Sequence, residues 1–131
     1  MTMASSKALN QLAKIFKDLH QPGKPIILAN VYDILSAEAV GSLESCKALA
    51  TASYAVARAA GTVDDDMTLE TNLKAVEGIG KVALRLQKPL SVDLQDAYGA
   101  ELEDAVRGVI ERGAVGINLE IGRASCRERV C

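Results

Sequence analysis

Short apolar runs alternate with longer amphipathic segments along most of the chain. Runs that are apolar on both faces and separated by helices are typical of strands in a parallel sheet. The runs lie at residues 25–30, 47–51, 90–92 and 114–119, and the segments with helical spacing lie at residues 34–43, 68–86 and 102–110. The pattern therefore predicts an α/β domain made of about four successive βα units.

The first twenty residues show a different pattern. Leu9, Leu12, Ile15 or Phe16, and Leu19 fall on one face of a helix, which predicts an amphipathic cap helix. No continuous apolar segment typical of a secretory signal is present there, so we expect a cytoplasmic protein. We divide the chain into a cap helix and linker (1–24), a partial α/β barrel (25–120) and a tail (121–131).

Composition narrows the functional classes. The chain has 131 residues, of which 49% are hydrophobic and 24% charged, and its formal net charge is −2. A nucleic-acid-binding surface needs clustered Lys and Arg, so we expect no nucleic-acid partner. No apolar run approaches the length of a membrane span, so we expect no membrane partner either.

The histidine and the cysteines offer little chemistry. His20 stands at the predicted end of the cap helix, and we expect a helix-end role rather than a catalytic one. The cysteines at 46, 126 and 131 have no metal-type or redox-type spacing. Cys46 precedes an apolar run and is expected to be a small buried side chain.

Polar residues gather where the predicted strands end. In α/β barrels these ends carry the active site. Such positions here are Asn30, Tyr32 and Asp33, then Thr51, Ala52 and Ser53, then Asp93, Gln95 and Asp96, and finally Glu120, with Asp64 in a loop after the second run. No glycine-rich turn follows the first strand, so a dinucleotide site is not expected. The pattern alone does not separate a barrel from an open sheet.

Asp93 and Glu120 come from successive strand ends and can converge on one cation. Mg²⁺ takes few protein carboxylates and leaves positions for water and substrate oxygens. Thr51, Ser53 and the backbone amides between them could hold a substrate carboxylate or phosphonate. An alternative stays open, because acidic residues and Thr or Ser at these positions also cap helices; this applies to Asp65, Asp66 and Asp96 as well as to Thr51 and Ser53.

Several segments together resemble the isocitrate lyase / phosphoenolpyruvate mutase superfamily, and most closely its small phosphonomutase-like members. The segments are Leu19-His20 with Ile27–Asn30, Ala50–Ala57, Gly61–Asp64, Val92–Gly99 and Gly113–Glu120. The resemblance implies the N-terminal half of a Mg²⁺-dependent TIM (β/α)8 barrel, a lyase or phosphonomutase that acts on 2-oxo or 2-hydroxy carboxylates or phosphonates through an enolate. It also implies that the complete enzyme is a homo-oligomer.

The same resemblance assigns roles to residues. It implies that Asp93 and Glu120 bind the metal and that Asp64 is a catalytic residue beside the substrate. It implies that Thr51, Ala52 and Ser53 contact the acid group of the substrate. Asn30, Tyr32 and Gln95 complete the expected substrate-binding set, with Asn30 and Tyr32 on the pocket floor.

The sequence departs from this pattern at three positions. Many relatives carry an acidic residue where this chain has Gln95, which predicts a weaker or altered cation site. Ala97 stands where glycine is usual, and Ile121 stands where aspartate follows the glutamate in relatives.

The last eleven residues, 121–131, resemble a translated sequencing adapter and are expected to be non-native. A full barrel needs about 250 residues and eight strands, so we expect this chain by itself to be inactive.

Two other hypotheses remain. The chain could be a non-catalytic half-barrel that self-associates or binds a partner. It could also belong to another class of metal-dependent barrel aldolase. A Schiff-base variant of such an aldolase needs a lysine at the carboxyl end of a strand, and Lys47 and Lys88 instead precede their strands.

Overall fold

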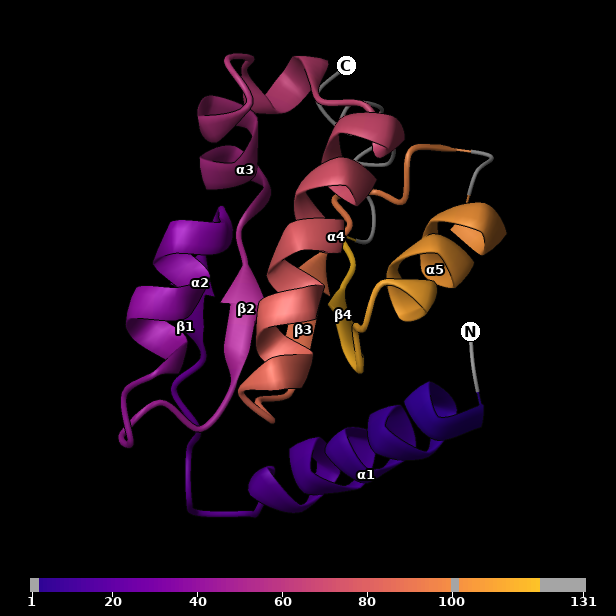
Figure 1. Cartoon of the computed structure of the whole chain (residues 1–131). Coiled ribbons are helices and arrows are strands. Elements are labelled where there is room, and N and C mark those ends of the chain that lie inside the picture. Colours follow the sequence, from indigo (N-terminus) through magenta and orange to yellow (C-terminus); the bar gives the residue numbers. More distant parts are fainter. Residues whose placement is uncertain (1–2, 100–101, 121–131) are drawn as a thin grey trace.

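A computed structural model describes residues 3–99 and 102–120 (Figure 1). Four parallel strands form one sheet in the order β1-β2-β3-β4. The strands are β1 (Ala29–Val31), β2 (Leu49–Thr51), β3 (Leu90–Asp93) and β4 (Gly116–Asn118). The helices are α1 (Met3–Leu19), α2 (Ile34–Gly41), α3 (Ser53–Ala59), the 3-10 helix η1 (Asp64–Asp66), α4 (Leu69–Arg85) and α5 (Leu102–Glu111).

The strand order identifies the type of sheet. Each strand pairs with the next one along the chain, whereas a doubly wound open sheet reverses its order at a switch point. Helices α2, α4 and α5 pack beside one another over one face of the sheet (Figure 1). The fold is therefore that of successive βα units of an α/β barrel, and four strands are half of the eight in a complete barrel.

The two faces of the sheet differ in burial. Val31, Leu49 and Leu90 are fully buried under the helices, while Asn30 and Asn118 on the other face are exposed. This alternation follows from strand geometry, in which successive side chains point to opposite faces. The main core between sheet and helices is built from Ala, Val, Leu and Ile side chains with Cys46, as the aliphatic composition predicts.

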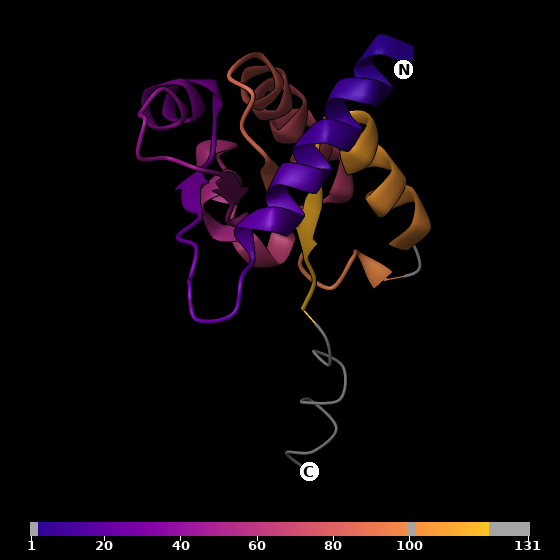
Figure 2. The same cartoon turned by 90° about the horizontal axis from the view of Figure 1, so that it is seen from below.

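Helix α1 lies across the amino ends of the strands, far from the ends that carry the polar residues (Figures 1 and 2). Leu9 and Leu12 are buried, and Phe16 is half-buried while Ile15 is 40% exposed. The predicted apolar face is confirmed, with Phe16 rather than Ile15 on it. A side chain on Gly116 would collide with the Phe16 ring, so this glycine lets α1 reach β4.

The predicted strand at residues 25–30 is wrong in its extent. Strand β1 begins only at Ala29, which pairs with Leu49, and Ile27 is 89% exposed. A strand exists only where a neighbouring strand offers hydrogen bonds, and β2 is itself short. The runs at 47–51 and 114–119 contract to three residues each for the same reason.

Helix α2 begins with a reciprocal capping arrangement. The Asp33 Oδ1 atom accepts a hydrogen bond from the Ser36 amide at 2.7 Å, and Ser36 Oγ accepts one from the Asp33 amide at 3.1 Å. The bond from the Ser36 amide, followed by that from its side chain, lowers the pKa of the Asp33 carboxyl below 3.8.

Replacing Asp33 by alanine should reduce the free energy of unfolding by about 1 kcal/mol, since an N-cap is lost. The lowered pKa means that the Asp33 contribution is present above pH 3.8 and is lost as the pH falls through its folded-state pKa. Urea titrations of wild type and variant in steps from pH 7 to pH 2 would measure this. A loss that does not shrink towards the acid end of this range would contradict the assignment.

The start of α4 settles one open alternative. Thr68 is its N-cap, and the Thr68 Oγ1 atom accepts a hydrogen bond from the Thr71 amide at 3.2 Å. Asp65 and Asp66 lie in η1 instead, so they do not cap α4. The predicted helix at 68–86 is confirmed to within one residue at each end.

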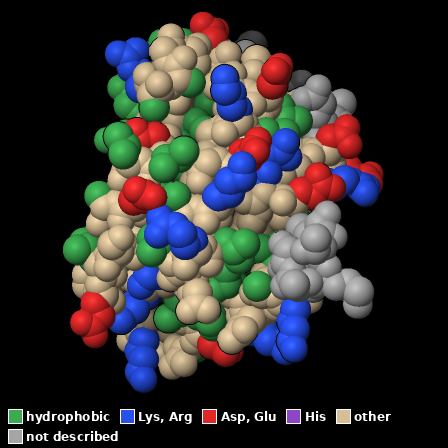
Figure 3. Space-filling model, in the orientation of Figure 1, with side chains coloured by type: hydrophobic (Ala, Val, Ile, Leu, Met, Phe, Trp, Pro, Cys, Tyr) green, Lys and Arg blue, Asp and Glu red, His purple; other side chains and the backbone are tan. Residues whose placement is uncertain are grey.

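Charges of both signs intermingle over the face formed by α2 and α4 (Figure 3). Exposed ion pairs join Lys81 to Glu77 and Arg85 to Glu38. Among the residues that the structure describes, no helix has the length and apolar character of a membrane span. The predicted tail at 121–131 lies outside the described residues, and the division of the chain into three parts stays a prediction.

Candidate active site at the carboxyl ends of the strands

Asp93 is the centre of a hydrogen-bonded network at the end of β3. Its Oδ2 atom accepts a bond from the Ser53 amide at 2.9 Å, and its Oδ1 atom accepts one from the Gln95 amide at 3.0 Å. The Asp93 amide donates to Thr51 Oγ1 at 3.0 Å. The carboxylate is thus held from both sides in one orientation, and each oxygen keeps a second lone pair for a ligand.

The contacts of Thr51 and Ser53 decide between two interpretations of these residues. The N-cap of α3 is Ala52, and it makes no side-chain capping bond. Thr51 and Ser53 therefore do not cap α3, and that alternative is wrong. Both residues are buried and bind Asp93, which occupies the Ser53 amide that a substrate anion could otherwise use.

Gln95 and Asp64 are hydrogen-bonded to each other at the edge of the sheet where the strands end, which we call the rim. The Gln95 Nε2 atom donates to the Asp64 Oδ1 atom at 2.8 Å and to the Asp64 carbonyl at 2.9 Å. Gln95 is only 4% exposed, so these bonds fix η1 against the end of β3. An acidic residue at position 95, as many relatives have, could not donate either of these hydrogen bonds and would place a second carboxylate against that of Asp64. Gln95 therefore permits a contact with Asp64 that an acidic residue would not.

Glu120 is brought to the same place by the backbone. Its amide donates to the Gln95 carbonyl at 2.7 Å, and Asp93 pairs with Asn118 in the sheet. The Glu120 side chain is exposed. One continuous hydrogen-bonded network thus joins the Thr51–Ser53 segment, Asp64, Asp93, Gln95 and Glu120.

Asn30 and Tyr32 are not connected to that network by any hydrogen bond among the described residues. Asn30 is exposed on the open face of the sheet. Tyr32 is 45% exposed and lines a separate hollow of about 540 Å³ with Val56, Thr71 and Lys74. Their place in a substrate pocket stays a prediction.

The loop after β3 has an unusual backbone. Gln95, Ala97, Tyr98 and Gly99 all have positive φ, between 50° and 74°. This left-handed region is unfavourable for residues with a side chain, and such strain is concentrated at functional sites. Ala97 adopts φ of 63°, which explains why glycine suits this position better. Asp96 does not cap a helix; its Oδ1 atom accepts a bond from the Tyr98 amide at 3.1 Å.

The Tyr98 hydroxyl lies under the acidic rim. The pKa of Tyr98 is raised to about 12, mainly by burial; a hydrogen bond from Asn72 opposes the rise, and the nearby Asp93, Asp64 and Asp96 carboxylates add to it. The Asn72 Nδ2 atom donates to this hydroxyl at 2.9 Å. The phenol is therefore neutral at physiological pH.

Tyr98 should ionise near pH 12, whereas a free tyrosine titrates near pH 10. Because the folded-state pKa is raised, the stability that it contributes is intact below about pH 10 and is lost as the pH rises towards 12. The difference in absorbance at 295 nm between wild type and Tyr98→Phe would isolate this titration. A midpoint near pH 10 would contradict the buried position.

Neither Asn72 nor Tyr98 is among the site residues predicted from the sequence. Asn72 is the polar member of the buried face of α4, which otherwise carries Val, Ile, Ala and Gly. A polar residue within an apolar helical stripe was the available signal. Tyr98 had no signal of its own, because its burial depends on helices distant in sequence.

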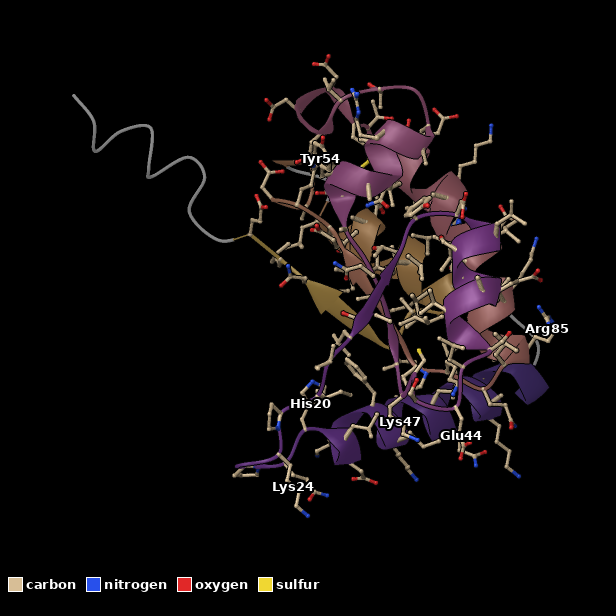
Figure 4. The ribbon with its side chains drawn as sticks, turned by 90° about the vertical axis from the view of Figure 1, so that its left-hand side faces the viewer. His20, Lys24, Glu44, Lys47, Tyr54 and Arg85 are labelled. Carbon is tan, nitrogen blue, oxygen red and sulfur yellow. The ribbon has the colours of Figure 1, made fainter. Side chains whose placement is uncertain are left out.

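The opposite end of the sheet holds residues with structural roles (Figure 4). The His20 ring shares a hydrogen bond with the Phe16 carbonyl at 2.7 Å, which confirms its helix-end role. Lys88 Nζ donates to the Cys46 carbonyl at 2.6 Å, and Lys47 Nζ donates to the Glu44 carbonyl at 3.0 Å. The lysines lie at the amino ends of the strands, away from Asp93, as predicted. Cys46 is buried, also as predicted.

The donor set at the rim fits a hard cation. Oxygen ligands from carboxylates suit Mg²⁺, which is commonly held by one or two of them with water and substrate. Within residues 3–99 and 102–120, no group of three or more His, Cys, Asp or Glu side chains could form a metal cage. Asp93 and Glu120 offer oxygen ligands of the kind that Mg²⁺ takes, and a magnesium site at this place stays a prediction.

Comparison with known proteins identifies the family. The family model for phosphoenolpyruvate phosphomutase matches residues 16–129. The chain belongs to the phosphoenolpyruvate phosphomutase family. An uncharacterized protein of Mycobacterium tuberculosis, recorded in strains CDC 1551 / Oshkosh and H37Rv, is 32% identical over 106 residues. These residues are 80% of this chain but 39% of that protein, so the chain spans about two fifths of its length.

Solved structures agree with this assignment. A protein of Burkholderia cenocepacia J2315 assigned as a phosphonomutase is 35% identical, with a TM-score of 0.76 over 84% of this chain and 45% of its own. A second protein from the same organism, assigned as a lyase or mutase, is 25% identical, with a TM-score of 0.76 over 90% of this chain and 43% of its own.

A third structure, 2,3-dimethylmalate lyase, is 22% identical, with a TM-score of 0.69 over 86% of this chain and 39% of its own, and shows the shared fold. The resemblance and the half-barrel fold read from the sequence are confirmed by this family.

Proposed function

We propose that the rim around Asp93 is the first half of a Mg²⁺-dependent active site that acts on 2-oxo or 2-hydroxy carboxylates, or on related phosphonates, through an enolate. The observation that carries this proposal is the Asp93 carboxylate, which two backbone amides hold in a fixed orientation at the end of a barrel strand. Membership of a family of mutases and lyases supports the reaction class.

The residues would divide the work as follows. Asp93 and Glu120 would hold the cation, and bound Mg²⁺ would polarise the carboxylate and carbonyl oxygens of the substrate. Asp64, anchored by Gln95, would stand beside the substrate as the catalytic residue. The acid group of the substrate would lie beside Thr51, Ala52 and Ser53. The floor of the substrate pocket would be formed by Asn30 and Tyr32.

Lyase and phosphonomutase chemistry share this half of the site. Both need an acid group held next to a carbonyl and a charge-stabilising cation. The substrate-selecting groups would come from the parts of the relatives that this chain does not span. In the same proposal, the complete enzyme would be cytoplasmic and homo-oligomeric. The half of the barrel by itself would be inactive.

Calorimetric titration of the chain tests the proposal. Mg²⁺ should bind, and pyruvate should bind only when Mg²⁺ is present, because the cation supplies positive charge beside the carboxylates of Asp64, Asp93 and Glu120. Oxaloacetate and phosphonopyruvate titrated in parallel would rank lyase-type and mutase-type substrates. Binding of pyruvate that is equal in Mg²⁺ and in EDTA would overturn the proposal.

A second candidate function is a half-barrel that associates through its sheet edges. Within the described sheet β1 and β4 are edge strands. Large apolar side chains are exposed beside them, including Ile27 (89%), Leu35 (75%) and Ile117 (42%). Exposed edges with apolar flanks favour association. Sedimentation equilibrium at increasing concentration would reveal a defined oligomer, and a monomer throughout would exclude self-association.

A further inference from the structure

Asn72 occupies a core position on α4. It is 0% exposed and shares its face with the buried residues Val76 and Ile79. An apolar side chain would fill this place without the cost of desolvating an amide. The presence of an amide in such a stripe therefore requires a specific partner.

Asn72 has two such partners. Its Nδ2 atom donates to the Asp93 carbonyl at 2.9 Å and to the Tyr98 hydroxyl at 2.9 Å. The Asp93 carbonyl can only accept a hydrogen bond, so the amide nitrogen must face it. One side chain thus joins the last residue of β3 to the far end of the loop that follows.

The orientation leaves one atom unsatisfied. Asn72 Oδ1 is buried and has no hydrogen-bond partner among the described residues. A buried acceptor without a partner is destabilising. Net stability alone therefore does not account for this amide, and the two donated bonds are its distinguishing contribution.

The two partners lie on either side of the positive-φ residues Gln95 and Ala97. Asp93 carries the carboxylate held by Ser53 and Gln95, and Tyr98 is one of the residues with positive φ. The Tyr98 ring also packs against both apolar clusters of the core. Asn72 therefore fixes the two ends of segment 93–98 from below the rim.

We propose that Asn72 is a positioning residue, which clamps the end of β3 to the Tyr98 hydroxyl and thereby sets the geometry with which Asp93 meets a divalent cation. This inference rests on the proposed function, since it takes Asp93 to be a cation ligand. It adds a residue on α4 that does not itself touch the cation.

The test compares Asn72→Leu with Asn10→Leu, which makes the same change at an exposed position on α1. Mn²⁺ serves as the probe cation, and its affinity is measured by calorimetry well below the unfolding temperature. Asn72→Leu should retain or raise the unfolding temperature and weaken Mn²⁺ binding about tenfold, as loss of an outer-shell partner does. It should also speed hydrogen exchange of the Gln95 amide. Asn10→Leu should leave both the Mn²⁺ affinity and the exchange of the Gln95 amide unchanged.

Tyr98→Phe provides an independent variant that keeps the ring. It should weaken Mn²⁺ binding in the same direction, and the double variant should lose less than the product of the two single losses. If Asn72→Leu fails to fold, Tyr98→Phe alone decides: wild-type affinity and exchange would overturn the proposal.

The remaining outcomes separate the two proposals. Wild-type Mn²⁺ affinity in Asn72→Leu, with binding abolished in Asp93→Asn, would overturn the positioning role alone. Unchanged affinity in Asp93→Asn would overturn the proposed cation site itself. An unfolding temperature that falls in Asn72→Leu while affinity stays unchanged would assign Asn72 a purely structural role.

Discussion

Replacing Asp93 by asparagine should weaken Mg²⁺ binding by about 100-fold or more, because the proposed site would lose one of its two carboxylate ligands. The new amide also cannot reproduce the native bonds. Both Asp93 oxygens accept from backbone N–H groups, those of Ser53 and Gln95, and an amide nitrogen would confront one of these donors. Calorimetric titration with MgCl₂ gives the affinity, and circular dichroism confirms that the variant is folded.

Asp18→Asn is the matched control. This variant makes the same change of charge near the end of α1, the helix that lies across the amino ends of the strands, whereas Asp93 ends β3. It should bind Mg²⁺ as wild type does. An equal loss in both variants would attribute the effect to overall charge, and no loss in Asp93→Asn would remove Asp93 from the cation site.

The second large effect is expected at Gly80, where two backbones touch. Gly80 is buried on α4, and a Cβ atom there would overlap the carbonyl oxygen of Arg112 in the turn before β4. That turn is fixed by bonds from the Arg112 amide to Val109 and from the Gly113 amide to Ile110. Neither backbone can yield without separating α4 from α5.

Gly80→Ala should therefore lower the free energy of unfolding by about 3 kcal/mol. For a domain of this size that corresponds to roughly 10 °C in the unfolding temperature. Gly78→Ala on the same helix is the control. A Cβ atom at position 78 would meet only the Ile34 side chain, at 2.7 and 2.9 Å. Because Ile34 is 51% exposed, its side chain can move away. Equal unfolding temperatures for the two variants would contradict the close packing.

The place of the Asp93 and Glu120 carboxylates at one edge of the sheet could be predicted from local sequence. Asp93 and Glu120 follow apolar runs, and the carboxyl ends of neighbouring parallel strands necessarily meet at one edge of a sheet. The bounds of α4 were predictable because its cap residue and its helical spacing are local signals. The family pattern predicts glycine at position 97, and the positive φ of Ala97 gives the physical reason.

Other features depend on contacts between distant residues. The Ser53 amide binds a carboxylate that lies forty residues later in the chain, so no local pattern distinguishes this from an ordinary helix cap. The bonds of Asn72 to Asp93 and Tyr98 cross 21 and 26 residues. The lengths of β1, β2 and β4 were also overestimated, because the neighbouring strand rather than the apolar run determines where a ladder begins.

Paramagnetic broadening by Mn²⁺ tests the central claim most directly. The ¹⁵N-labelled chain would be titrated with Mn²⁺ and the loss of each amide signal recorded. The account predicts that broadening begins at the amides of Ser53, Gln95 and Glu120, which the Asp93 network brings together, and that Asp93→Asn removes it. Broadening that begins elsewhere, or persists at these amides in Asp93→Asn, would contradict a cation site at Asp93.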